Sequence, residues 1–223
     1  AYVAAAERWL GETASRGDTF LFLGGGAYTL PRRVAERDPT ARITVVELDP
    51  EVTRAAYGCF GLRPEHGVAS VHGDARAVAE GLGEEGARFD RVYVDVYDGR
   101  ESLPYALVTA EAFTLFRRLL RPGGALALNV IGVAAEEGAL RLWSTVRTCC
   151  EVFPSVELYV HLGRAYPERQ NFLLAASPEP GHRFPERAGT FERWPREEWP
   201  GWAGTTVFRD RPPPGEEKRA AAS

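Results

Sequence analysis

The chain has 223 residues, of which 44% are hydrophobic, and a formal net charge of −4. This length suits one α/β domain with a short appendage and leaves little room for two full domains. The negative charge argues against nucleic acid or an anionic membrane as the main partner, because neither would find a basic surface.

Cysteine content and terminal composition indicate the compartment. Three cysteines without a C-x-x-C pair predict neither a zinc site nor a disulfide framework, so we expect a reducing cytoplasm. No apolar run approaches the ~18 residues of a membrane span, and Ala1–Leu10 lacks the order of a signal peptide. The chain contains no methionine, which leaves open that an upstream segment is missing.

The predicted elements begin with a helix at Tyr2–Leu10, followed by a buried strand at Phe20–Leu23 that runs into the glycines Gly24–Gly26. Glycine lets the main chain approach a ligand, and the helix predicted at Tyr28–Arg37 offers free N–H groups at its start. This order predicts a cradle for a ribosyl ligand. A turn that binds nothing is the alternative, because G-x-G-x-x-G is matched only if Thr29 replaces the last glycine.

The second predicted strand, Ile43–Asp49, ends in acidic residues. Glu47 follows Gly26 by 21 residues (26 to 47), the spacing at which a strand-end acid reaches the ribose hydroxyls. We therefore expect Glu47 to bind ribose, with an exposed acid as the alternative. Asp49 precedes Pro50 and is expected to cap the next helix.

Two further predicted strands bring acids to the same end of the sheet. After Val68–Asp74, Asp74 is expected either to accept from the amine of a purine or to cap the following helix. The strand Arg88–Tyr97 delivers Asp95 and Asp98 to its carboxyl end, where ligands bind in open α/β sheets. Two carboxylates facing a cationic donor suit binding an amine and accepting its proton, whereas a surface acid beside a turn cap is the alternative.

The later pattern completes an α/β fold that we predict to be a doubly wound, mostly parallel, seven-stranded sheet. Its last two strands have no helix between them, which predicts an antiparallel hairpin at one edge. The expected later elements are a helix capped by Thr109, a turn at Arg121–Gly124, a strand at Ala125–Ile131, a helix at Glu136–Cys150, and the hairpin strands Val156–Leu162 and Phe172–Ala176.

The composition changes at Pro178 to proline, glycine and charge. We expect residues 1–177 to form a Rossmann-like nucleoside-binding domain and residues 178–223 to form a Pro/Trp-rich extension. The rings of Trp194, Trp199 and Trp202 are expected to pack over the domain, with a partner-binding motif as the alternative. Pro212–Ser223 is predicted to be disordered.

Five elements in this order resemble the class I S-adenosylmethionine-binding fold and, within it, the spermidine synthase family. They are the glycine loop, Val-Glu-Leu-Asp, Gly-Asp-Ala, Asp-Val-Tyr-Asp and Arg-Pro-Gly-Gly, between about Asp18 and Ser177. The resemblance implies donor-binding residues Gly24, Gly25, Gly26, Glu47 (ribose) and Asp74 (adenine), and acceptor-orienting residues Asp95 (the base) and Asp98.

Two departures from the family pattern put polyamine synthesis in doubt. Spermidine synthases carry an aspartate after the three glycines, which suits the ammonium group of decarboxylated S-adenosylmethionine, whereas this chain has Ala27. The amino-terminal β-hairpin domain through which such enzymes form dimers is expected to be absent, because no room precedes Ala1. A homodimer is left open.

We therefore expect a transferase that uses S-adenosylmethionine or its decarboxylated form to alkylate a small acceptor, a cationic amine among the candidates. No metal, nucleic acid or membrane is expected to take part. The alternatives are a small-molecule methyltransferase, a catalytically silent nucleoside-binding scaffold and an NAD-binding oxidoreductase. The last would leave Asp95 and Asp98 without a role. The sequence leaves the acceptor and the transferred group open.

Overall fold

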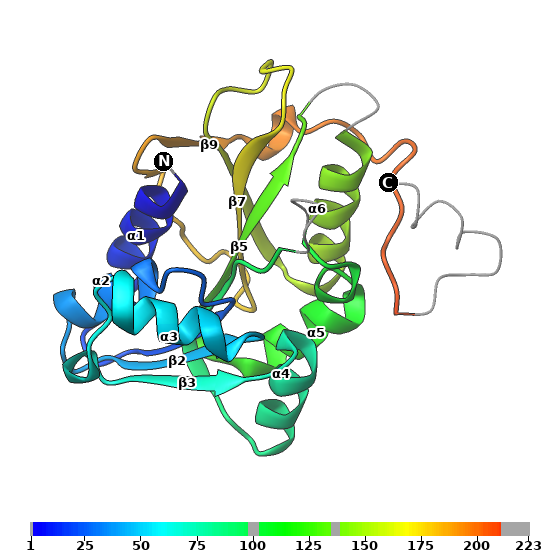
Figure 1. Ribbon diagram of the computed structural model, residues 1–223. Coiled ribbons are helices and arrows are strands. Elements are labelled where there is room, and N and C mark those ends of the chain that lie inside the picture. Colours follow the sequence, from blue (N-terminus) through cyan, green and yellow to red (C-terminus); the bar gives the residue numbers. More distant parts are fainter. Residues whose placement is uncertain (1, 98–102, 135–138, 211–223) are drawn as a thin grey trace.

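The computed structural model describes residues 2–97, 103–134 and 139–210, and a nine-stranded sheet runs through it (Figure 1). The strand order is β3-β2-β1-β4-β5-β7-β6-β9-β8. The strands are β1 (Thr19–Leu23), β2 (Arg42–Glu47), β3 (Val68–His72), β4 (Phe89–Val94), β5 (Leu120–Gly132), β6 (Ser155–Val160), β7 (Gln170–Ser177), β8 (Arg187–Ala188) and β9 (Phe191–Trp194).

The apolar run that precedes the glycines forms the centre of the parallel half of the sheet. Strand β1 is buried at every position and pairs in parallel with β2 on one side and β4 on the other. A strand covered on both faces needs a continuous apolar sequence, and Phe20–Leu23 supplies it. Strands β3 and β5 extend the parallel set at either side.

The helices cover both faces of the sheet, as a doubly wound fold requires. Those on one face are α1 (Tyr2–Thr13), α2 (Thr29–Arg37) and α3 (Pro50–Cys59), which share one core cluster. Those on the other face are α4 (Ala75–Glu84), α5 (Ala110–Leu119) and α6 (Leu140–Val152). Figure 1 shows the two groups on opposite sides. The expected α/β architecture is confirmed.

The predicted number of strands is wrong, because the extension contributes two more. Strand β7 is antiparallel to β5 and β6, so the predicted antiparallel pair is present. Strand β9 then pairs with β6, and β8 with β9, so the pair does not lie at the edge. Phe191 and Trp194 of β9 are buried, which gives this short strand its apolar anchors. A Pro-rich composition obscured that local pattern.

Several local expectations can be compared with the structure. Asp49 caps α3 by accepting from the Glu51 N–H, and Thr109 caps α5 by accepting from the Ala112 N–H, both as predicted. Leu140, the first residue of α6, is 44% exposed. Among the helices that the described ranges contain, none is both long and apolar enough to cross a bilayer.

The described part of the extension packs its aromatic rings onto α6. The ring of Trp194 lies 5.0 Å from that of Trp143, and the ring of Trp199 lies 6.1 Å from the same indole. Trp202 is more exposed, at 37%. The boundary expected at residue 177 stays a prediction, and Pro212–Ser223 lies outside the described residues.

Candidate active site

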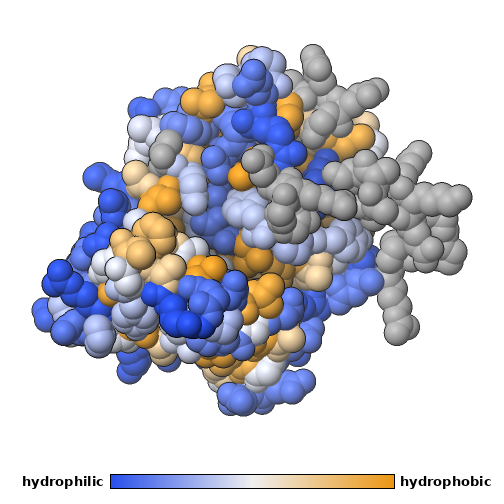
Figure 2. All heavy atoms as spheres, viewed as in Figure 1, coloured by the Kyte–Doolittle hydropathy of each residue, from blue (hydrophilic) through white to orange (hydrophobic). Residues whose placement is uncertain are grey.

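A cavity of about 610 Å³ opens at the carboxyl ends of β1, β2 and β4. On the side viewed in Figure 1, hydrophobic patches near the middle and lower part of the surface are interspersed with hydrophilic residues (Figure 2). Asp98, one of the predicted site residues, lies outside the described residues. The other predicted site residues all line this cavity: Gly24, Gly25, Gly26, Glu47, Asp74 and Asp95.

The glycine loop makes a tight turn against the end of β4. Gly24 has φ +96°, and a Cβ built on it would lie 2.3 Å from the carbonyl oxygen of Asp95. Only glycine fits this position, because both the backbone angle and the space exclude a side chain. The turn continues with a hydrogen bond from the Tyr28 N–H to the Gly25 carbonyl (2.8 Å), and Tyr28 itself has φ +55°.

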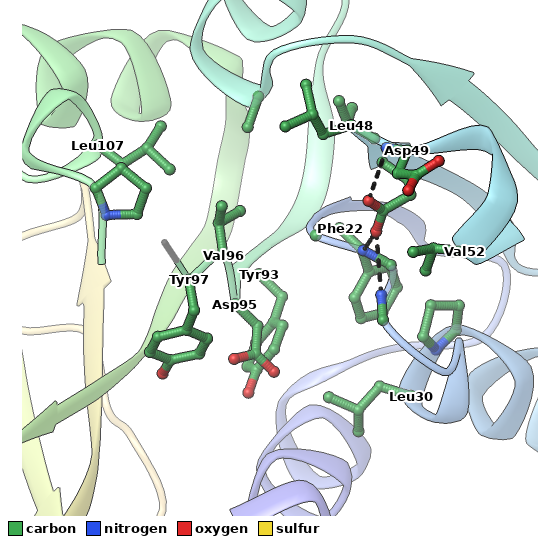
Figure 3. Close-up of a pocket in the computed structure, with 18 of the residues that line it drawn as sticks. Phe22, Leu30, Leu48, Asp49, Val52, Tyr93, Asp95, Val96, Tyr97 and Leu107 are labelled. Carbon is green, nitrogen blue, oxygen red and sulfur yellow. Dashed lines mark hydrogen bonds between the residues drawn. The ribbon is translucent and has the colours of Figure 1, made fainter. Parts of the chain in front are cut away.

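The carboxylate of Glu47 holds this loop to the end of β2. Its Oε2 accepts from the N–H groups of Gly25 (2.9 Å) and Gly26 (3.2 Å), and its Oε1 accepts from the Asp49 N–H (3.1 Å) (Figure 3). A carboxylate has about four acceptor positions, so one remains for a ligand hydroxyl. The role of Glu47 toward ribose stays a prediction, and the structure adds that Glu47 orders the glycine loop.

Asp74 takes the helix-capping place that the sequence left open, since its carboxylate accepts from the Ala77 N–H (2.9 Å) at the start of α4. Its expected contact with adenine stays a prediction. Apolar side chains flank this part of the cavity, and Figure 3 shows Leu48 and Leu107 on opposite sides of it. Leu48 is 71% exposed, so a large apolar side chain stands at the cavity wall without a covering group.

Asp95 is a partly buried acid that lines the cavity. Burial raises the pKa of its carboxyl from the ordinary 3.8 to about 6, and a hydrogen bond from the Asn129 side-chain amide (3.0 Å) opposes that rise. The Asn129 side-chain oxygen in turn accepts from the Asn171 amide (3.0 Å). Two amides from β5 and β7 therefore fix an acid that is largely ionised at neutral pH and can take a proton.

Three tyrosines surround this acid. Tyr97 donates to the Asn129 carbonyl (2.9 Å), whereas the buried hydroxyl of Tyr93 has no hydrogen-bond partner among the described residues. Tyr2, from α1, also lines the cavity. Burial, together with the nearby charge of Asp95, raises the pKa of all three phenols, so they stay protonated and able to donate.

Sequence reasoning did not mark Tyr2 or Tyr93 as site residues. Tyr93, Asp95 and Tyr97 are spaced two residues apart at the end of β4, and this alternation was a readable sign that their side chains share one side. No comparable sign marked Tyr2, which reaches the cavity only because α1 packs over the sheet.

Comparison with known proteins identifies related folds. No model of a known protein family matches the chain. Over 117 residues it is 30% identical to the polyamine aminopropyltransferase of Vibrio vulnificus, a match that covers 52% of this chain and 39% of that relative. The chain therefore matches well under half of the relative's length.

Two solved structures share the architecture. The probable spermidine synthase of Corynebacterium glutamicum has a TM-score of 0.71 at 24% identity, covering 94% of this chain and 81% of the other. Human methyltransferase-like protein 13, solved in complex with SAH, has a TM-score of 0.65 at 21% identity, covering 82% of each chain. The chain is thus similar in sequence to a polyamine aminopropyltransferase, and it shares its fold with these two solved structures.

Proposed function

We propose, from this similarity to the spermidine synthase-like class I family, that the chain is a transferase that alkylates a small acceptor. The donor is S-adenosylmethionine or its decarboxylated form. One observation carries the proposal: the glycine loop and the partly buried acid share one cavity wall, with the Gly24 backbone pressed against the Asp95 carbonyl. A donor on the loop would therefore present its reactive end toward Asp95.

The residues divide into donor and acceptor groups. The glycine loop and Glu47 would hold the ribose end of the nucleoside, and Asp74 would receive its base. When bound, the positive sulfur would supply an electrophilic carbon. Asp95 would accept the proton of the attacking nucleophile, while Asn129 holds its carboxylate in place, so that positioning and proton transfer both lower the barrier.

The acceptor is expected to be a small molecule, with a cationic amine as the leading candidate. An ionised Asp95 among protonated phenols attracts an ammonium group and accepts a hydrogen bond from it, and Asp98 would add a second carboxylate. Assays with amines and other nucleophiles in turn identify the acceptor.

We also propose a cytoplasmic location, since all three cysteines are free thiols.

Ala27 leaves the site open to intact S-adenosylmethionine as donor. It lines the cavity at the position where spermidine synthases carry an aspartate. Like charges at ~4 Å cost ~1 kcal/mol in water and more in a partly dry cleft, so an aspartate there disfavours the carboxylate of intact S-adenosylmethionine. Ala27 removes that discrimination, and this observation favours the second candidate function, a small-molecule methyltransferase.

Calorimetric titration with S-adenosylmethionine, its decarboxylated form, methylthioadenosine and NAD tests the proposal. The wild-type chain should bind intact S-adenosylmethionine at least as well as the decarboxylated form, and Ala27→Asp should reverse the order by about tenfold or more. Glu47→Gln should weaken the binding of S-adenosylmethionine, its decarboxylated form and methylthioadenosine. Binding of NAD alone would contradict the proposal, and binding without product from any acceptor would favour a silent scaffold.

A further inference from the structure

The last described stretch of the chain, residues 205–210, crosses three helices and is here named the strap. Figure 1 shows it running along α6 toward α5. The side chain of Arg147 on α6 donates to the Thr205 carbonyl (2.8 Å), and the Thr148 hydroxyl accepts from the Phe208 N–H (2.9 Å). The Phe208 carbonyl then accepts from Ala110, the first residue of α5 (2.9 Å).

The strap ends at Asp210, which contacts two residues. One is Arg76 in the cavity wall, and the other is Thr109, which caps α5. The Asp210 carboxylate accepts from the Arg76 guanidinium (2.8 Å) and from the Thr109 hydroxyl (2.6 Å). Arg76 lies in the first turn of α4 and lines the cavity. The same guanidinium donates to the Ala106 carbonyl (2.8 Å). Asp210 therefore holds in place the Arg76 side chain that is bonded to the loop at residues 104–107.

The loop at residues 104–107 forms part of the cavity wall through Pro104, Ala106 and Leu107. Its described backbone bonds join Leu107 to Pro104 and Val108 to Tyr105. The strap adds a hydrogen bond from the Tyr105 hydroxyl to the Arg209 carbonyl (2.9 Å) and places the Phe208 ring 5.2 Å from the Tyr105 ring. The wall therefore depends on contacts from a distant segment, since Tyr105 and Arg209 are 104 residues apart in the sequence.

We propose that the strap positions this wall for the nucleoside, and that Asp210 is its positioning residue. The inference rests on the proposed function for the identity of the ligand. When the wall is already ordered, binding does not include the entropic cost of ordering it. The strap therefore raises nucleoside affinity without contacting the ligand. By reciprocity, bound nucleoside stabilises the strap.

Asp210→Asn tests the inference in the full-length chain. The asparagine amide would turn an N–H toward the Arg76 guanidinium, while its oxygen could still serve Thr109. We expect affinity for S-adenosylmethionine to fall about fivefold to tenfold and amide exchange at Leu107 and Val108 to accelerate. Arg209→Gln is the matched control, because the Arg209 side chain pairs only loosely with Glu111 (3.9 Å) and should leave both readouts unchanged.

The affinity and the amide exchange test the role of the strap separately from the proposed function. Unchanged affinity together with unchanged exchange at Leu107 and Val108 in Asp210→Asn would overturn the inference. Should the wild-type chain bind no S-adenosyl compound, the proposed function fails, and the exchange comparison alone decides the strap: faster exchange supports it and equal exchange overturns it. Tyr105→Phe, which removes the hydroxyl bonded to Arg209, should also accelerate exchange.

Discussion

Asp95 shows how a single residue can be unfavourable for folding and useful for chemistry. Burial makes its charged form costly, while the Asn129 amide offsets part of that cost. The resulting pKa of about 6 leaves the acid ionised at neutral pH but still basic enough to accept a proton. Turnover should accordingly rise as the pH increases through about 6, because only the ionised form serves as base.

Replacing Asp95 by asparagine should stabilise the fold while removing activity. A folded pKa above the ordinary 3.8 means that the carboxyl stabilises the fold below pH 3.8 and loses this contribution as the pH rises through about 6. Asp95→Asn should therefore be more stable than wild type by up to ~2–3 kcal/mol at pH 8 and nearly equal at pH 4. Urea unfolding at both pH values measures the difference, and turnover should fall ~10² or more.

Asp38 supplies a control of opposite sign. Hydrogen bonds from Thr40 and from the Gly17 N–H lower the pKa of its carboxyl, so its contribution to stability is present above its ordinary pKa and lost as the pH falls through the lowered value. Asp38→Asn should therefore destabilise the fold at pH 8. If both variants destabilise the fold at pH 8, the Asp95 interpretation is wrong, whereas if both stabilise it, the Asp38 interpretation is wrong.

At the scale of elements, the turn between β1 and α2 carries the functional geometry. Gly24 and Gly26 both have positive φ, at +96° and +50°, yet their surroundings differ. A Cβ at Gly24 would collide with the Asp95 backbone, whereas a Cβ at Gly26 would meet no atom within 4 Å. The open space beside Gly26 belongs to the cavity that it lines.

These two glycines make a matched pair of variants. Gly26→Ala should cost about 1 kcal/mol of stability from the backbone angle alone, and its methyl group should still weaken S-adenosylmethionine binding by occupying cavity space. Gly24→Ala should cost several times more, because the strand end must also move. Thermal unfolding and calorimetry measure the two effects. Equal stability losses would mean that the loop does not press against β4 as observed.

At the scale of the whole molecule, the extension completes the cores on both faces of the sheet. Phe184 and Phe191 belong to the core cluster beneath α1, and Trp194 and Phe208 to the one beneath α5 and α6. Burying each large apolar side chain contributes ~1.5–3 kcal/mol. Their sum is comparable with the ~5–15 kcal/mol by which a whole domain is stable.

A chain that ends at residue 177 should therefore not unfold cooperatively. It keeps the seven strands expected from the sequence but exposes the two core clusters that the extension covers. Calorimetric unfolding of residues 1–177, with residues 1–210 as the control, measures the effect. A cooperative transition of the shorter chain within a few degrees of the control would instead support residues 1–177 as an independent domain.

The sequence by itself determined the parallel half of the fold and the loops that follow its strands. The apolar run before Gly24, the acids at Glu47 and Asp95, and the caps at Asp49 and Thr109 are local signals, because burial, turn geometry and capping act over a few neighbouring residues. Since carboxyl ends of parallel strands meet at one edge, these signals also predicted that the acids share a cavity.

Only the tertiary structure decided which distant segments complete that cavity and the sheet. Asn129 reaches Asp95 because β4 and β5 are neighbours in the sheet. Asn171 holds Asn129 because β7 lies beside β5, although 42 residues separate the two amides. Arg76 and Asp210 are 134 residues apart, and strands β8 and β9 join the sheet from a Pro-rich extension. Such contacts depend on how complete elements pack, and no local pattern of residues encodes which remote partner an element will find.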